Sequence, residues 1–257
     1  MSNVLLQGLL PWLVLIFILS GIVKGLTGFG MPFIAIPSST IILGVPVTQA
    51  MGWVLASAFV TNLVQLFQTR ANWKILHRIW LPVSTLLVTM AFSVQLLTVI
   101  KSEWLLVILG VIIILAISFQ LKQQWIIREN RKSSILIASG LVSGLFGGVT
   151  AFYGFPFLPT LVASGIRDES FIFSASFILL TGGLVLATGL GSQGLMTATD
   201  TMLSVVLFFP ALVGMFIGQR ARRKLSTKRF ELIVLVVLFG TGTSLLLRGL
   251  LEVARSI

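Results

Sequence analysis

The sequence predicts an all-α polytopic membrane protein, and three observations lead to this fold class. The chain has 257 residues, of which 56% are hydrophobic and only 10% are charged, whereas a soluble domain carries about 25% charged residues. Several apolar runs approach the roughly 20 residues that a membrane-spanning helix needs. The cations are gathered in short segments between these runs, which is the usual distribution in multi-pass membrane proteins.

Six runs are each long enough to cross a bilayer. In chain order they are Val47–Gln68, Ile79–Ile100, Glu103–Leu121, Glu169–Leu190, Thr201–Gly218 and Phe230–Leu250. Two other regions, Leu15–Val45 and Ser134–Ser164, are apolar but contain Gly and Pro, which interrupt helices. We expect each to form a re-entrant helical hairpin, with broken tips at Gly25–Pro32 and Gly144–Tyr153.

The two interrupted regions are copies of each other. A shift of 119 residues aligns them without gaps and gives six identities within the nine positions Ser20–Gly28. Phe33 and Pro37 then fall on Phe152 and Pro156. This is the signature of an internal duplication, so the predicted units are a first repeat (1–121), a basic linker (122–133) and a second repeat (134–257).

The charge distribution orients the two repeats. Thirteen of the 18 Lys and Arg residues lie in Arg70–Arg78, Lys122–Lys132 and Arg220–Arg229, and the positive-inside rule places these three segments in the cytoplasm. Equivalent spans then run in opposite directions, so we expect inverted repeats, a common plan of secondary transporters. Contact with membrane lipid fits the same pattern, and nucleic acid is not expected as a partner.

Lys24 is an isolated cation in the first interrupted region, and the nearest acidic residue in the sequence is Glu103. A charge in the middle of the bilayer costs about 2.5–3.5 kcal/mol, and a bound anion could offset that cost. Broken helices also expose free N–H groups at a positive dipole end, which attract anions. The tips therefore predict an anion site.

The predicted substrate-binding residues come from both tips and one neighbouring span. They are Lys24, Gly25, Thr27, Gly28 and Gly30 in the first tip, Ser143, Gly144, Gly147, Thr150 and Tyr153 in the second, and Asn62 and Gln65 on one face of Val47–Gln68. Two alternatives stay open at this point. Lys24 could extend to the membrane interface, and the hydroxyls and amides could serve helix packing.

Other chemistries find little support in the sequence. The chain has no cysteine, one histidine and seven carboxylates, so we expect no disulfide, metal or cofactor. It also lacks an H-E-x-x-H or Walker motif, which argues against a zinc hydrolase and against ATP-driven transport by this chain. We therefore expect that the protein is not an enzyme.

The segments SGIVKGLTGFGMPFIAIP and SGLVSGLFGGVTAFYGFPFLP, which begin at Ser20 and Ser139, resemble the paired motifs of the sulfite exporter TauE/SafE family. The resemblance covers about Leu10–Leu250. It implies a bacterial inner-membrane transporter of small anions such as sulfite or an organosulfonate. An anion channel that uses the same tips remains an alternative. The oligomeric state stays open, with a homodimer as one option.

Overall fold

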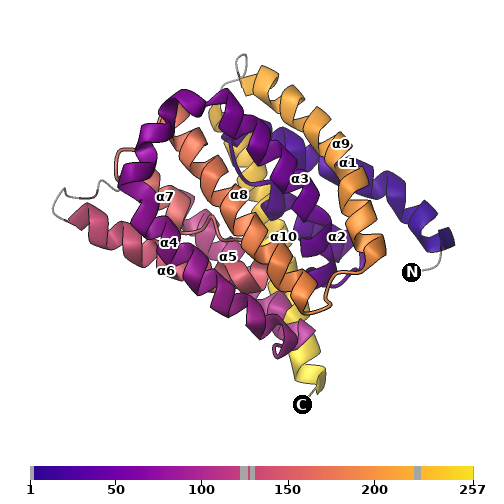
Figure 1. Ribbon diagram of the computed structural model, residues 1–257. Coiled ribbons are helices and arrows are strands. Elements are labelled where there is room, and N and C mark those ends of the chain that lie inside the picture. The colour runs from indigo at the N-terminus through magenta and orange to yellow at the C-terminus, as the bar shows by residue number, and fades with distance from the viewer. Residues whose placement is uncertain (1–2, 122–126, 128–130, 223–226, 257) are drawn as a thin grey trace.

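The computed structural model describes residues 3–121, 127, 131–222 and 227–256, and this part of the chain contains α-helices and 3-10 helices but no strand (Figure 1). The predicted all-α class is therefore confirmed. Within these described residues, six helical segments are long and apolar enough to cross a membrane, which agrees with a polytopic membrane protein. Most of the predicted basic linker (122–133) lies outside the described residues.

The helices follow the same order in each half of the chain: two helices joined by a short break, then three long helices. The first half contains α1 (Asn3–Thr27), α2 (Met31–Leu43), α3 (Val47–Gln68), α4 (Leu76–Ser93) and α5 (Ser102–Leu121). The second contains α6 (Lys132–Thr150), α7 (Phe157–Ala163), α8 (Asp168–Ser192), α9 (Ala198–Arg222) and α10 (Thr227–Ser256). The 3-10 helices η1 (Arg70–Ile75) and η2 (Val94–Thr98) flank α4.

Three predicted segments differ in detail from the structure. The predicted span Ile79–Ile100 is divided between α4 and η2. The first arms of the hairpins are also longer than a re-entrant hairpin requires, because Gly8–Thr27 of α1 and Lys132–Thr150 of α6 are both long enough to cross a membrane.

Hydrogen bonds between elements define two ends of the bundle. At one end, which contains Arg70–Arg78 and is called the basic end, the bonds are Gln219 to Gln68, Ser170 to Asn72 and Arg78 to Ser164. At the other, called the Asp200 end, they are Gln49 to Asp200, Gln193 to Val94 and Arg248 to Thr40. Helices α3 and α9 therefore run towards the basic end, and their counterparts α8 and α4 run away from it.

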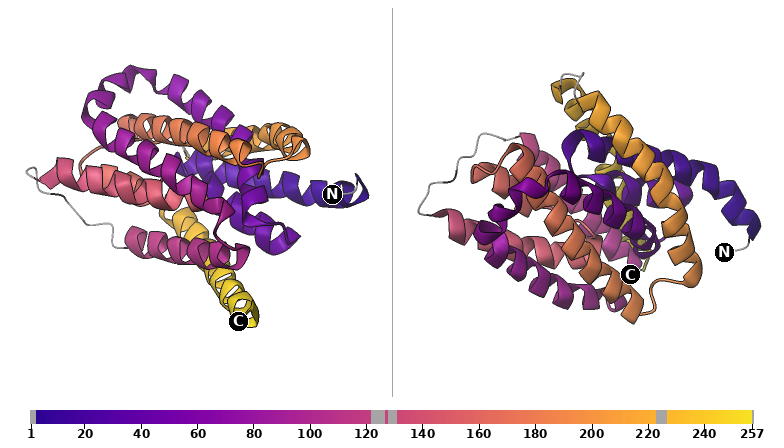
Figure 2. Two further views of the ribbon diagram at one scale, coloured as in Figure 1. Left: turned by 60° about the horizontal axis from the view of Figure 1, so that its bottom comes forward. Right: turned by 45° about the horizontal axis from the view of Figure 1, so that its top comes forward.

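Six helices form a row in the order α6, α4, α8, α3, α9, α1, in which each helix packs against the next. Figure 1 shows α4, α8, α3 and α9 side by side. The row reads the same in reverse when each helix is replaced by its counterpart in the other half of the chain, since α1, α3 and α9 correspond to α6, α8 and α4 under the 119-residue shift. The pair α5–α10 lies on one side of this row, away from α8 and α9 (Figure 2).

Equivalent glycines bring each outer helix of the row close to its neighbour, α1 to α9 and α6 to α4. A Cβ atom at Gly21 of α1 would overlap the backbone oxygen of Ala211 on α9, and one at Gly140 of α6 would overlap that of Pro82 on α4. Small residues allow such close approach of helix backbones. One turn later, Gly25 meets Met215 and Gly144 meets Leu86. Helix α1 therefore runs in the same direction as α9, and α6 in the same direction as α4, so α1 enters from the Asp200 end and α6 from the basic end.

Candidate functional site

The first hairpin breaks where the sequence predicts. Helix α1 ends at Thr27, and Gly28 and Gly30 have φ angles of +86° and +96°, a left-handed conformation that glycine adopts at little cost. Helix α2 then begins at Met31 with Pro32 in its first turn, where the missing N–H of proline is not needed. Thr27 supports the break, because its Oγ1 accepts a 3.3 Å hydrogen bond from the Phe29 N–H.

The second hairpin breaks later than predicted. The expected tip was Gly144–Tyr153, but α6 continues through Gly144 and Gly147 to Thr150, and the chain leaves the helix over residues 151–156. The two glycines serve packing instead of a break. Gly144 faces the backbone of α4, and a Cβ atom at Gly147 would lie 2.7 Å from the Cα atom of Tyr153.

Hydroxyl groups satisfy the backbone around this second break. Ser143, which corresponds to Lys24 in the first repeat, accepts a 2.8 Å hydrogen bond from the Phe157 N–H at the start of α7. Thr150 accepts one from the Phe152 N–H, and the Tyr153 hydroxyl donates to the Leu179 carbonyl oxygen at 2.9 Å. These three predicted binding residues therefore already have protein partners.

The two hairpins meet inside the bundle. The rings of Phe33 and Phe152 are stacked, with centroids 4.2 Å apart and planes 19° from parallel. These two residues are equivalent under the 119-residue shift. Phe29 of the first tip also contacts Phe171 of α8 edge to face, with a centroid distance of 6.0 Å. The broken tips thus lie against each other and against α8.

Lys24 lies beside the first tip and faces α3. Its side chain is 1% exposed, as is that of Asn62, and its Nζ donates a 2.5 Å hydrogen bond to the Asn62 Oδ1. Among the described residues, the ammonium has this hydrogen bond and no ion pair. Burial inside the bundle argues against the alternative in which Lys24 extends to an interface.

The side-chain oxygen atoms of Asn62 and Gln65 both accept hydrogen bonds from other residues of the protein. An ammonium only donates, so the Asn62 atom that contacts Lys24 must be its oxygen. The Gln65 Oε1 accepts from the Ser176 hydroxyl of α8 at 3.3 Å. Neither NH₂ group has a hydrogen-bond partner in the part of the chain that the structure describes.

The structure brings only part of the predicted set together. Lys24, Asn62 and Gln65 lie along the contact of α1 and α8 with α3, and Gly28 lies at the adjoining break. Gly25 faces the backbone of α9 and does not line this group. Asn62 lies six residues before the end of α3, about 9 Å along the helix axis, so the group is nearer to the basic end than the expected central position.

A second buried polar cluster was missed by sequence reasoning. Asp200, which is 5% exposed, accepts hydrogen bonds from the Trp53 Nε1 at 2.8 Å, the Gln49 Nε2 at 2.9 Å and the Thr197 N–H at 3.1 Å. The spacing of Thr197 and Asp200 resembles a capping box, which begins a helix. That signal could have identified the start of α9, but not the contact with α3.

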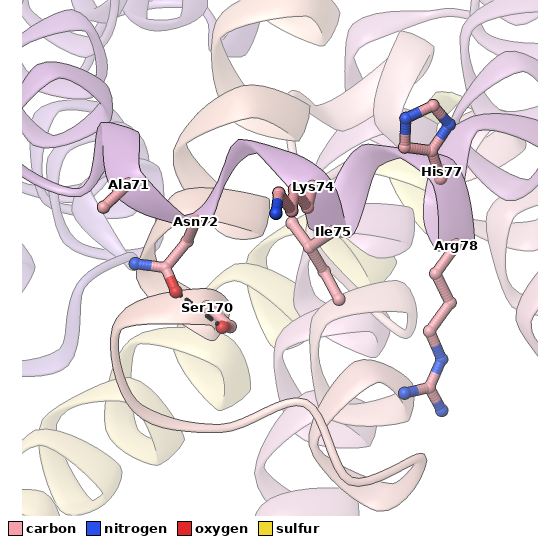
Figure 3. Close-up of a pocket in the computed structure, with 7 residues that line it drawn as sticks. All are labelled: Ala71, Asn72, Lys74, Ile75, His77, Arg78 and Ser170. Carbon is pink, nitrogen blue, oxygen red and sulfur yellow. Dashed lines mark hydrogen bonds between the residues drawn. The ribbon is translucent and has the colours of Figure 1, made fainter.

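A surface pocket lies at the basic end, outside the Lys24 group (Figure 3). It is lined by Lys74, His77 and Arg78 from η1 and α4, and by Asn72, which accepts a hydrogen bond from Ser170 of α8. His77 is exposed. This pocket therefore belongs to the basic loops and not to the buried tips.

Two opposed broken hairpins in an apolar helical bundle, with a buried cation beside one break, define a multi-pass membrane transport protein. Comparison with protein families supports this class. The chain belongs to the sulfite exporter TauE/SafE family, whose model matches residues 13–245. No curated protein and no solved structure matches the chain. Because the family is one of transporters for sulfite-type and sulfonate-type anions, membership agrees with a transport role and not with an enzyme.

Proposed function

We propose that the protein is a secondary transporter, in the direction of export, for sulfite or a small organosulfonate in a bacterial inner membrane. The anion binds beside the first hairpin tip, against Lys24, Asn62 and Gln65. The observation that carries this proposal is the burial of Lys24, at 1% exposure, with a neutral amide oxygen as its described partner. A buried charge without a counter-ion is costly, and a bound anion removes that cost.

The hydrogen-bonding capacity around Lys24 favours an anion over a cation. The acceptor atoms of the group, Asn62 Oδ1 and Gln65 Oε1, are already bonded. The polar groups that the structure leaves without a partner are donors: the two amide NH₂ groups and the other ammonium protons. Charge-assisted hydrogen bonds to an oxyanion are the strong class of such bonds.

The helix directions support inverted repeats and alternating access. Helices α3 and α8 run in opposite directions, and the two hairpins enter from opposite ends of the bundle. In transporters with this plan, one repeat moves against the other around a fixed site. We place the basic end in the cytoplasm, as the positive-inside rule requires.

Ligand-induced thermal stabilisation tests the site. Purified protein is screened with sulfite, sulfate, thiosulfate, sulfoacetate and taurine. A ligand present at 100 times its dissociation constant raises the free energy of unfolding by about 2.7 kcal/mol. We expect stabilisation by at least one of the anions, its loss in Lys24→Met, and partial retention in Lys24→Arg, because a guanidinium keeps the charge but not the shape of an ammonium.

Undiminished stabilisation of Lys24→Met would exclude the lysine as a ligand. Counterflow in proteoliposomes then separates a carrier from a channel. A carrier loaded with unlabelled sulfite on one side accelerates the entry of labelled sulfite from the other, whereas a channel shows no such acceleration.

A further inference from the structure

The surface pocket at the basic end contains two cations that take no part in the proposed anion site. Its volume is about 570 Å³, which lies within the roughly 300–1,000 Å³ typical of small-molecule sites. Figure 3 shows Lys74 between Asn72 and Arg78 along the pocket. The pocket is therefore large enough for a phosphate and its ester substituents.

Both cations keep hydrogen-bond donors for a ligand. The Arg78 guanidinium donates a 2.9 Å hydrogen bond to the Ser164 carbonyl oxygen, and a guanidinium has five N–H groups in all. The Lys74 side chain is exposed, and neither cation forms an ion pair with a carboxylate among the described residues. Two positive charges with unused N–H groups favour an anion, because phosphate oxygens accept strong, charge-assisted hydrogen bonds from such groups.

The nearby carboxylates lie outside the pocket. Asp168 and Glu169 begin α8 just before Ser170, which lines the pocket, but neither acid does so. Glu169 accepts a 3.4 Å hydrogen bond from the Asn72 amide and not from a cation of the described residues. The lining of the pocket therefore keeps its positive charge.

Exposed tryptophans place this pocket at the edge of the membrane. Trp73 directly precedes Lys74, and Trp80 follows Arg78 by two residues. Their side chains are 54% and 61% exposed, and tryptophan is enriched at the headgroup level of a bilayer. Trp73 also contacts the ring of His77, with centroids 6.1 Å apart. Cations at this depth meet the phosphate groups of lipids.

An exposed apolar face of α4 begins directly beside the pocket. His77 lines the pocket, and the residue four positions later lies on the next turn of the same helix face. The exposed apolar side chains of this face are Trp80, Leu81, Val88 and Phe92. Because α4 runs away from the basic end, the face leads from the pocket towards the other end of the bundle. A ligand with an anionic head and an apolar tail matches both parts.

We infer that the pocket binds the phosphate of an anionic phospholipid, whose acyl chains lie along the exposed face of α4. Basic pockets between membrane-spanning helices bind anionic headgroups in this way. A free oxyanion would use the cations alone, whereas a phospholipid also covers Trp80 and Leu81. The inference goes beyond the proposed function and does not rest on it, because Lys24, Asn62 and Gln65 do not line this pocket.

Lipid-induced thermal stabilisation of the detergent-solubilised protein tests the inference. The probe is dioleoylphosphatidylglycerol, which is anionic, and the reference is the zwitterionic dioleoylphosphatidylcholine. We expect a larger rise of the unfolding midpoint with the anionic lipid. Lys74→Gln combined with Arg78→Gln should weaken the apparent affinity for phosphatidylglycerol by about thirtyfold, because two cations at the membrane surface are lost. Lys74→Gln alone, which removes only an exposed ammonium and should fold, should weaken it by about fivefold.

Arg220→Gln combined with Arg222→Gln is the matched control. Both residues are exposed at the end of α9, outside the pocket, so the same number of charges is removed. Their affinity for phosphatidylglycerol should equal that of wild type. An equal loss in the control pair, or an unchanged affinity in Lys74→Gln, would overturn the inference.

Two further measurements separate the other occupants. Glycerol phosphate, which has the head but no acyl chain, should stabilise the protein less than phosphatidylglycerol does at the same concentration; equal stabilisation would show a site for free oxyanions and overturn the inference. Native mass spectrometry should show phosphatidylglycerol retained by the wild type and lost from the Lys74→Gln, Arg78→Gln variant. A dimer that retains no lipid would show that a second copy of the chain covers this face, and would also overturn the inference.

Sulfite distinguishes this inference from the proposed function. Sulfite-induced stabilisation should be unchanged in the pocket variants, because Lys24 is intact. A wild type that binds phosphatidylglycerol at the pocket but shows no stabilisation by any of the screened anions would overturn the proposed function alone.

Discussion

The contact between Lys24 and Asn62 makes a quantitative prediction about stability without ligand. Both side chains are 1% exposed and their polar atoms are 2.5 Å apart. Asn62→Leu keeps a side chain of similar size but removes the described acceptor of the ammonium. A hydrogen bond to a charged group contributes about 1.5–3 kcal/mol. We therefore expect Asn62→Leu to lower the free energy of unfolding by about that amount.

The same substitution should have a much smaller effect when the charge is absent. Lys24→Met removes the ammonium and its insertion cost, so this variant should be as stable as wild type or more stable. In the Lys24→Met background, Asn62→Leu leaves no buried cation without its acceptor. The double-mutant cycle should then give a coupling energy of about 1.5–3 kcal/mol.

Thermal unfolding of the four detergent-solubilised proteins measures this coupling. For chains of 150–250 residues, about 1 kcal/mol corresponds to roughly 2–4 °C, which predicts a lowering of the midpoint by roughly 3–12 °C for Asn62→Leu alone. Gln68→Leu, on the same helix but bonded to Gln219, is the control and should be additive with Lys24→Met. Additivity of Asn62→Leu with Lys24→Met would refute the assigned contact.

Two further predictions concern topology and the glycines. Cysteines at Ala71 and Thr227 should react with a membrane-impermeant label only from the cytoplasmic side, and one at Ser192 only from outside; labelling of positions 71 and 227 from opposite sides would contradict the inverted repeats. Gly28→Leu and Gly147→Leu should both abolish sulfite transport. They should also destabilise the fold for different reasons, which the monodispersity of the purified proteins checks. Gly147→Leu forces Tyr153 to move, which lowers the free energy of unfolding by about 1–3 kcal/mol. Position 28 has more space, but its left-handed backbone costs a leucine about 1–2 kcal/mol. Normal transport by both variants would show that neither glycine is required.

The sequence was most informative where one residue type had one physical meaning. The bounds of α3 were predicted as Val47–Gln68 and observed there, because Pro46 precedes a run without charged residues that ends just before Arg70. Pro32 was likewise expected to bound the first tip, and it lies in the first turn of α2. Glycine has two meanings, since it breaks helices and also allows them to approach closely. In α6 the second meaning prevails at Gly144 and Gly147, so the second tip was placed too early.

The candidate site was predictable in part, because a lysine in an apolar segment also has one physical meaning. An isolated lysine in an apolar segment must find a polar partner, and Asn62 was among the candidates for the binding group. The burial of Asp200 could not be read from the sequence. A carboxylate near the start of an apolar run is usually interfacial, and its contact with Trp53 joins residues separated by 147 positions. Only the packing of α9 on α3 creates that contact.

The two tips share a backbone plan but not the same chemistry, and this difference limits where the anion can bind. In the second tip, Ser143 and Tyr153 are engaged by the Phe157 N–H and the Leu179 carbonyl oxygen. In the first, Lys24 keeps ammonium protons beyond its bond to Asn62. In the proposed function, an anion that needs a positive charge therefore binds beside only the first of the two tips. If the repeats exchange conformations during transport, the anion stays with the first hairpin while the Phe33–Phe152 contact between the tips rearranges. A single anion per cycle is then expected in spite of the duplicated fold.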